Sequence, residues 1–110
     1  MTESEFQNIS EQLFAYIQEQ IETQSDAFDC VNDGNVLSAE HENGITIIIN
    51  RHLPTQELWI ASPSGGFHFS EHNGNWFSSR ENADFFTVLN KILQEVSGES
   101  LVVKSVNFQA

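Results

Sequence analysis

The feature that most constrains the fold is a series of short β-type runs between Gly44 and Phe69. The runs are rich in Ile, Thr and Trp, residues that fit a half-buried pleated surface, and they cover 45–50, 57–61 and 67–70. Pro and Gly in the two connections supply turns. If Leu58 and Ile60 face a core, strand alternation directs Trp59 outward. The stretch therefore predicts consecutive strands with a Trp on the face opposite the core.

Further short runs flank this stretch and are separated by hairpin signals. Asn43-Gly44, Asn73-Gly74 and either Asp33-Gly34 or Gly34-Asn35 suit two-residue turns, whose central positions need positive φ. The additional strands are expected at about 28–32, 36–42 and 76–78. Strands that follow one another through tight turns predict an antiparallel meander, here of five to six strands.

Two amphipathic helices enclose the meander, one over 4–24 and the other over 82–97, where Gly98 ends it. Because each helix must bury one apolar stripe, both can pack on the same face of the sheet. Residues 101–108 are β-rich and predict either a last strand or an extended tail along the helices. The expected fold is a single α+β domain over 1–110, a two-layer α/β sandwich.

The charge is strongly acidic and unevenly distributed. Sixteen Asp and Glu against four Lys and Arg give a formal net charge of −12, which argues against nucleic acid as a ligand. Such a field favours cations or a basic protein surface, although an acidic surface also serves solubility alone. The first 42 residues contain no Lys or Arg and ten acids: Glu3, Glu5, Glu11, Glu19, Glu22, Asp26, Asp29, Asp33, Glu40 and Glu42.

The sequence gives little support for a membrane protein, a disulfide-bonded protein or an enzyme. No apolar run has transmembrane length and the N-terminus is acidic, so a cytoplasmic protein without membrane contact is expected. The single Cys30 excludes an internal disulfide framework, and the neighbouring Asp29 disfavours its thiolate. Neither a nucleophile motif nor a phosphate-binding loop is present. We therefore expect a protein that is not an enzyme.

The acidic cluster is the strongest candidate for a metal site, and it comprises Glu19, Glu22, Asp26, Asp29 and Asp33. Carboxylate oxygens are hard ligands that suit cations such as ferric iron, manganese or calcium. The sequence has no EF-hand pattern, so the site would be open and weak, and a merely solvated acidic face is the alternative. The four histidines lack zinc-site spacing: His41, His52, His68 and His72.

The outer sheet face is the second candidate site. Asn50 and Trp59 would share it, together with Thr46 and Ile48. An exposed Trp with apolar neighbours is the kind of anchor that dominates the energy of protein interfaces. The alternative is that Trp59 lies under a loop or under the C-terminal tail.

The central motifs resemble the signature of the frataxin family, most closely its bacterial CyaY type. The residues that carry the resemblance are Asn43-Gly44, Ile48-Ile49-Asn50-Arg51, Pro54, Leu58-Trp59-Ile60-Ala61, Gly65-Gly66-Phe67-His68-Phe69 and Trp76. The similarity extends from Ser4 to about Gly98 and weakens toward the C-terminus. It implies a frataxin-like sandwich with both helices on one face of the sheet.

The resemblance also implies a function. Frataxins bind iron (Fe2+ or Fe3+) weakly and reversibly at an acidic surface ridge and take part in iron–sulfur cluster assembly. Bacterial members contact the cysteine desulfurase through that ridge, and the scaffold protein is a second candidate partner. The ridge corresponds to Glu19, Glu22, Asp26 and Asp29, more loosely to Asp33, and the sheet-face contact to Asn50 and Trp59.

Three roles remain open within this resemblance: an iron-binding regulator or iron supplier, a metal-independent regulator of the desulfurase, and a ferroxidase. The ferroxidase role has the least support, because the sequence shows no buried carboxylate–His site that could hold iron in a fixed geometry. The expected state is a monomer that can oligomerise with iron. The sequence departs from the family where His52 and Glu57 replace Gln. Its ridge also holds fewer acids than is usual, which favours partner binding over the binding of many iron ions.

Overall fold

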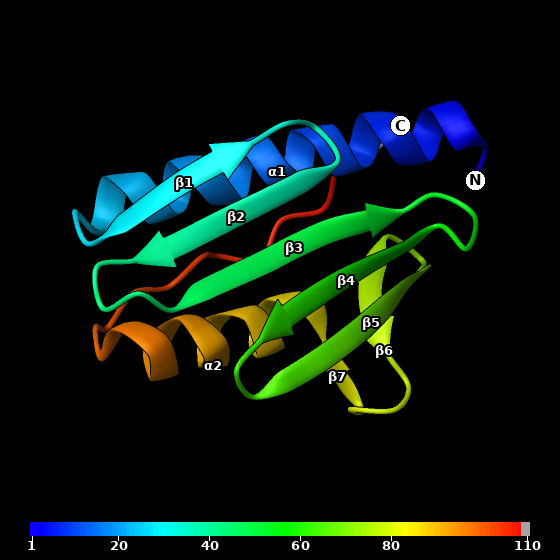
Figure 1. The fold of residues 1–110 in the computed structure, drawn as a ribbon. Coiled ribbons are helices and arrows are strands. Elements are labelled where there is room, and N and C mark those ends of the chain that lie inside the picture. Colours follow the sequence, from blue (N-terminus) through cyan, green and yellow to red (C-terminus); the bar gives the residue numbers. More distant parts are fainter. Residues whose placement is uncertain (109–110) are drawn as a thin grey trace.

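The computed structural model describes residues 1–108 as two layers, a seven-stranded antiparallel sheet and two helices that cover one of its faces (Figure 1). The strands lie in the sheet in sequence order, from β1 to β7. The predicted fold class is confirmed. The elements are α1 (Glu3–Gln24), β1 (Phe28–Asn32), β2 (Val36–His41), β3 (Thr46–His52), β4 (Glu57–Ser62), β5 (Gly65–His72), β6 (Asn75–Ser78), β7 (Ala83–Asp84) and α2 (Phe85–Ser97).

The largest departures from the predicted elements lie after β4. β5 covers 65–72 instead of 67–70, and a seventh strand, β7, pairs with β6 through Phe77 opposite Asp84. The prediction that the second helix begins at Asn82 is wrong. Asn82 has a φ of 51°, in the left-handed region, so the chain turns there, pairs briefly as β7 and enters α2 only at Phe85. Other boundaries differ by one or two residues.

α1 begins with a reciprocal cap and buries one apolar stripe. The Thr2 hydroxyl accepts from the Glu5 amide at 3.1 Å, and the Glu5 carboxylate accepts from the Thr2 amide at 2.7 Å. Phe14, which the periodicity leaves unassigned, is fully buried. The helix ends where Ser25 N–H donates to the carbonyl of Ile21. The buried stripe faces the sheet and forms one half of the core: Phe6, Ile9, Leu13, Phe14, Ile17 and Ile21.

The C-terminal segment after α2 is an extended tail, not a strand, over the residues described up to Phe108. It runs between α1 and α2 on the helical side of the sheet (Figure 1). Leu101 and Val103 are buried there, with 3% and 0% of their surface exposed. The tail therefore closes the groove between the two helices. Neither helix within residues 1–108 is both long and apolar enough to cross a membrane.

Candidate functional site

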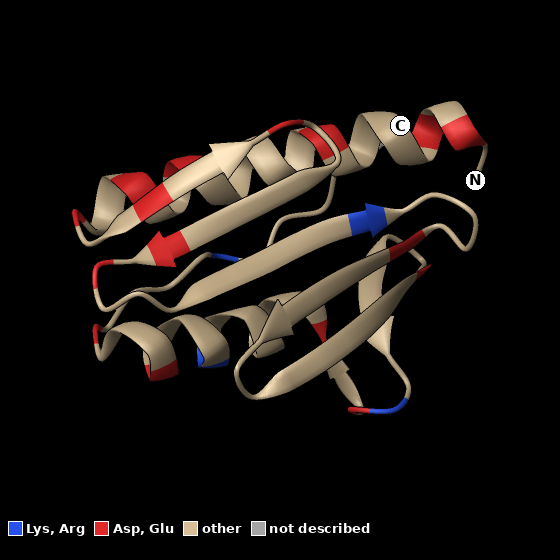
Figure 2. Cartoon of the chain, viewed as in Figure 1, with Lys and Arg blue, Asp and Glu red and all other residues tan. Residues whose placement is uncertain are grey.

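Four of the predicted acidic residues form an exposed line, here called the acidic ridge, which consists of Glu19, Glu22, Asp26 and Asp29. It follows the last turns of α1, crosses the connection to β1 and continues on the outer face of the sheet. Figure 2 shows the acidic residues gathered at this end of the molecule, over α1, β1 and the end of β2.

The fold positions the ridge through the short connection between α1 and β1. Ser25 is buried there; its hydroxyl accepts from the Ala27 amide at 3.1 Å and donates to Glu99 at 2.8 Å. This turn directs the chain from the helix into β1, which packs against α1 and pairs with β2. Ridge residues from the helix and from the strand consequently share one edge of the molecule.

The electrostatics of the ridge are unfavourable for folding. The last turn of α1 contains no basic residue, although its C-terminal end carries the negative pole of the helix dipole. Asp29 lies directly opposite Glu40 in the β1–β2 register, and like charges in that position destabilise a sheet. Within residues 1–108 the single ion pair joins Arg51 to Glu11, away from the ridge. A cation or a basic surface bound at the ridge would relieve this repulsion.

Glu40 was missed as a site residue, although the sequence contained a usable signal. Strand alternation places Glu40 on the outer face, and a two-residue turn at Gly34-Asn35, one of the two turn positions that the sequence offers here, gives the register that pairs Asp29 with Glu40. The structure brings Glu40 opposite Asp29, at the same end of the sheet as the ridge.

Asp33, the fifth predicted metal ligand, lies at the other end of β1. One of its carboxylate oxygens accepts from the amides of Asn35 at 2.9 Å and Val36 at 2.7 Å. These backbone hydrogen bonds lower its pKa and fasten the β1–β2 hairpin. In the part of the chain that the structure describes, no three His, Cys, Asp or Glu side chains gather closely enough to enclose one metal ion. The carboxylates form an open line.

The ridge acts electrostatically on Cys30, the neighbour of Asp29 in β1. Burial, together with the charges of Glu22 and Asp29, raises the pKa of the Cys30 thiol to about 11. The thiol therefore stays protonated at neutral pH, as the sequence predicts for a cysteine beside a carboxylate. Since Glu22 belongs to α1 and Asp29 to β1, the fields of the two halves of the ridge converge on this strand.

Alkylation of Cys30 by iodoacetamide gives a direct test of that convergence. We expect the pH–rate profile of the folded protein to rise near pH 11, so that at pH 8 only about one thiol in a thousand is ionised. Glu22→Gln should shift the profile to lower pH, because it removes one of the two carboxylate charges, whereas Glu95→Gln on α2 serves as the matched control. A wild-type profile centred near pH 8.5 would contradict the expectation.

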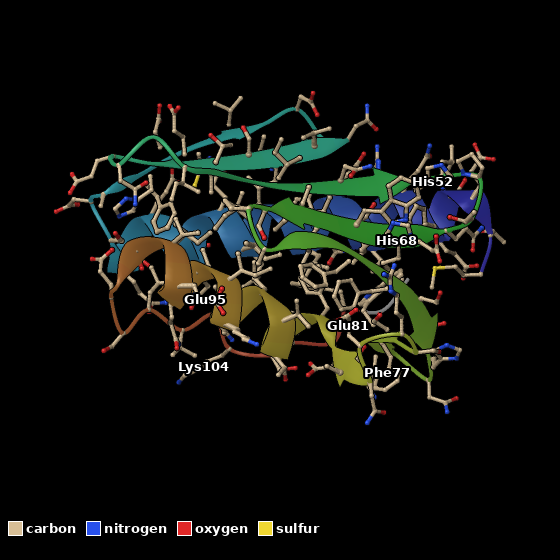
Figure 3. All side chains as sticks on the ribbon, turned by 60° about the horizontal axis from the view of Figure 1, so that its bottom comes forward. His52, His68, Phe77, Glu81, Glu95 and Lys104 are labelled. Atoms are coloured by element: carbon tan, nitrogen blue, oxygen red, sulfur yellow. The ribbon has the colours of Figure 1, made fainter. Side chains whose placement is uncertain are left out.

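The outer face of the sheet contains the second candidate site. Asn50 in β3 and Trp59 in β4 lie opposite each other and point away from the helices, as predicted. Trp59 is half-buried, and the described part of the tail runs on the other, helical side of the sheet. Its indole is stacked between two imidazoles, His52 at a centroid distance of 4.2 Å and His68 at 4.3 Å, with interplanar angles of 10° and 8°. Figure 3 shows His52 and His68 at the same end of the sheet.

Glu57 fixes the edge of this stack. Its Oε1 accepts from Trp59 Nε1 at 3.1 Å and from the Thr55 hydroxyl at 2.9 Å. The hydrogen bond from Trp59, with those from Thr55 and Ser70 and the nearby His68, lowers the pKa of Glu57 against the opposing effect of burial. The carboxylate is thus ionised at neutral pH and satisfied within the fold.

The stacking of His52 and His68 on Trp59 is not predictable from the sequence pattern. His68 is directly opposite Trp59, and His52 follows Asn50 by two residues on the same face of β3. Their association depends on the registers of three strands, which the sequence pattern alone leaves undetermined.

Known proteins resemble this chain over nearly its whole length. Residues 1–99 match the family described as the frataxin-like domain. The iron–sulfur cluster assembly protein CyaY of Neisseria meningitidis serogroup C / serotype 2a is 50% identical over 106 residues, which are 96% of this chain and 99% of the relative. The protein of the same name from Janthinobacterium sp. (strain Marseille) is 38% identical over 112 residues, covering 97% of this chain and 100% of the relative.

Two solved structures have the same architecture. The frataxin from Psychromonas ingrahamii superposes with a TM-score of 0.87 at 32% identity, covering 96% of this chain and 100% of that one. Trimeric frataxin from the yeast Saccharomyces cerevisiae, complexed with ferrous iron, gives a TM-score of 0.67 at 25% identity, covering 90% and 88%.

Proposed function

This chain belongs to the frataxin family, in its bacterial CyaY branch. From that membership we propose that it binds iron and either regulates iron–sulfur cluster assembly or supplies iron to it. The relatives carry the name of a cluster assembly protein and not that of an enzyme, in agreement with the expectation that this chain is not an enzyme. In this proposal iron is the cargo or the signal, and the protein works in the cytoplasm.

The observation that carries the proposal is the acidic ridge without a basic partner. Four exposed carboxylates, those of Glu19, Glu22, Asp26 and Asp29, lie on one edge at a folding cost, and the described residues contain no ion pair there. Hard oxygen ligands suit Fe2+ and Fe3+, with Asp33 as an outlying member of the set. Because the ligands are open to water, binding is weak and reversible, which is compatible with passing the ion on.

The same ridge is the proposed contact for a basic surface on the cysteine desulfurase. Glu19 and Glu22 would supply charge complementarity, which governs association rate and salt dependence. On the outer sheet face, Asn50 and Trp59 are the proposed second contact, with the desulfurase or with the scaffold protein. In the yeast relative, a trimer is the form complexed with ferrous iron. We propose a monomer here that oligomerises only when iron is bound.

An NMR titration with ferrous iron under anaerobic conditions tests the metal assignment. We expect amide signals of Glu19–Asp29 to broaden first, because the paramagnetic ion sits at the ridge, while signals of α2 remain sharp. Replacing Glu19 and Glu22 by Gln should raise the iron concentration needed for broadening. Uniform broadening over the whole protein would rule the ridge out as the iron site.

Charge reversal separates the iron-binding role from the metal-independent alternative. Glu19→Lys with Glu22→Lys should weaken desulfurase binding at least tenfold, or about 1.4 kcal/mol, and salt should weaken the wild-type complex. The matched control is Glu81→Lys with Glu95→Lys, which makes the same change in net charge on exposed residues elsewhere. If wild-type binding is unchanged in iron-free buffer with chelator, iron binding is incidental to this contact. If only Trp59→Ala disrupts the complex, the sheet face is the main contact instead.

A further inference from the structure

A chain of hydrogen bonds at the β3–β4 turn fixes the protonation of one ring nitrogen of His52. His52 Nδ1 lies 2.7 Å from the Thr55 hydroxyl oxygen, which lies 2.9 Å from Glu57 Oε1. An ionised carboxylate only accepts hydrogen bonds, so the single hydroxyl proton of Thr55 points to Glu57. The Thr55 oxygen must then accept from His52, and Nδ1 carries the proton.

The neutral His52 ring is therefore in the Nδ1–H form, which leaves the lone pair on Nε2. No described residue hydrogen-bonds to Nε2. Because every buried side-chain nitrogen and oxygen in residues 1–108 has a hydrogen-bond partner, Nε2 is in contact with solvent. The free nitrogen is an accessible Lewis base.

The stack holds the imidazole in a fixed orientation. One ring face of His52 lies on the Trp59 indole, nearly parallel at 10°, and Trp59 is itself held by His68 on its other face and by Glu57 at its Nε1. In histidines that bind metals, one ring N–H typically donates a hydrogen bond toward a carboxylate, and the other ring nitrogen is open to the metal. Thr55 provides the link to the carboxylate here.

We propose that His52 Nε2 is a nitrogen ligand for a single divalent transition-metal ion, positioned by the Thr55–Glu57 relay. Imidazole suits ions such as Fe2+, Co2+, Ni2+ and Zn2+ and suits Mg2+ or Ca2+ poorly. No three His, Cys, Asp or Glu side chains gather in the described residues, so water fills the other coordination positions in the isolated chain and affinity is low. The site lies at the opposite end of the sheet from the acidic ridge and does not depend on ridge carboxylates (Figure 1).

The tautomer is the first measurable consequence. Long-range 15N–1H correlation spectra of the imidazole rings at pH 8 should show protonated Nδ1 and unprotonated Nε2 for His52. Thr55→Val, which removes the hydroxyl from an exposed turn residue, should remove the preference, and Thr55→Ser should keep it. An Nε2–H form of His52 in the wild-type protein would overturn the proposal.

Titration with Co2+ tests the ligand itself, with the ring signals of His52 and His72 followed together. His72 is exposed and its ring stacks on no aromatic ring of residues 1–108, so it serves as an internal reference. The His52 signals should broaden at a roughly tenfold lower Co2+ concentration than those of His72, the size of effect that an orienting partner provides. Thr55→Val should abolish this difference, whereas Thr55→Ser, and Gln at both Glu19 and Glu22, should preserve it. Equal broadening of both histidines, or no effect of Thr55→Val, would refute the assignment.

Discussion

Deletion of residues 101–110 is expected to lower the free energy of unfolding by about 4 kcal/mol, the largest effect we predict for any change in this chain. Leu101 and Val103 are almost fully buried between α1 and α2, and each contributes about 1.5–3 kcal/mol through burial. Without the tail, their places in the groove become exposed apolar surface on the helices. Conformational entropy regained by the free chain end offsets only part of the loss.

Side-chain amides hold the tail as a neighbouring strand would. Asn90 on α2 accepts from the Val103 amide at 2.7 Å and donates to the Val103 carbonyl at 2.9 Å. Gln24 on α1 makes the same pair of bonds to Val102, at 3.1 and 2.8 Å. The tail thereby connects the two helices.

The measurement is urea unfolding followed by far-UV circular dichroism. The matched control ends at Lys104, which keeps the buried residues and the Tyr16 hydroxyl bond to the Lys104 carbonyl but loses the Phe108 ring, 5.9 Å from the Tyr16 ring. That shorter deletion should cost about 1 kcal/mol. Equal stability of the two truncated forms would show that the buried segment contributes nothing.

The strands and helices were predictable because their signals are local. Tight turns such as Asn43-Gly44 set neighbouring strands antiparallel, and a stripe at three- and four-residue steps defined each helix. The position of the tail was not predictable, since a β-rich run is compatible with a strand and its actual partners are amides of distant helices, Gln24 and Asn90. Propensity describes the conformation of such a segment and leaves its location open.

The residues of the candidate site likewise fall into those that local spacing places and those whose position depends on long-range pairing. Helical spacing was enough to place Glu19 and Glu22 on one flank of α1. The position of Asp33 depended on where the hairpin turned, and the stack around Trp59 depended on three strand registers at once. A shift of one residue in either neighbouring strand would remove a histidine from the outer face.

Arg51 connects the sheet to α1, a role that the sequence does not indicate. In β3 its side chain points to the helical side and is only 10% exposed. One guanidinium nitrogen donates to the Gln7 carbonyl and to the Ser10 hydroxyl, both at 3.0 Å, and Nε donates to Asn35 in the β1–β2 hairpin at 3.0 Å. A single cation thus joins α1, β3 and the hairpin. Glu11, which is 56% exposed, adds the ion pair at 3.4 Å.

We therefore expect Arg51→Met, which keeps the aliphatic stem but removes every donor, to lower the free energy of unfolding by about 3 kcal/mol, because several partly buried charge-assisted hydrogen bonds are lost together. Glu11→Gln isolates the ion pair and should cost less than about 0.5 kcal/mol, since an exposed carboxylate gains little from pairing in water. Arg51→Lys should fall between them, because one ammonium reaches the acceptors on α1 but cannot also reach Asn35. Denaturant unfolding of the three variants measures the series. If Arg51→Met and Glu11→Gln lower the free energy of unfolding equally, the exposed ion pair, and not the hydrogen bonds of the Arg51 guanidinium, holds α1 to the sheet.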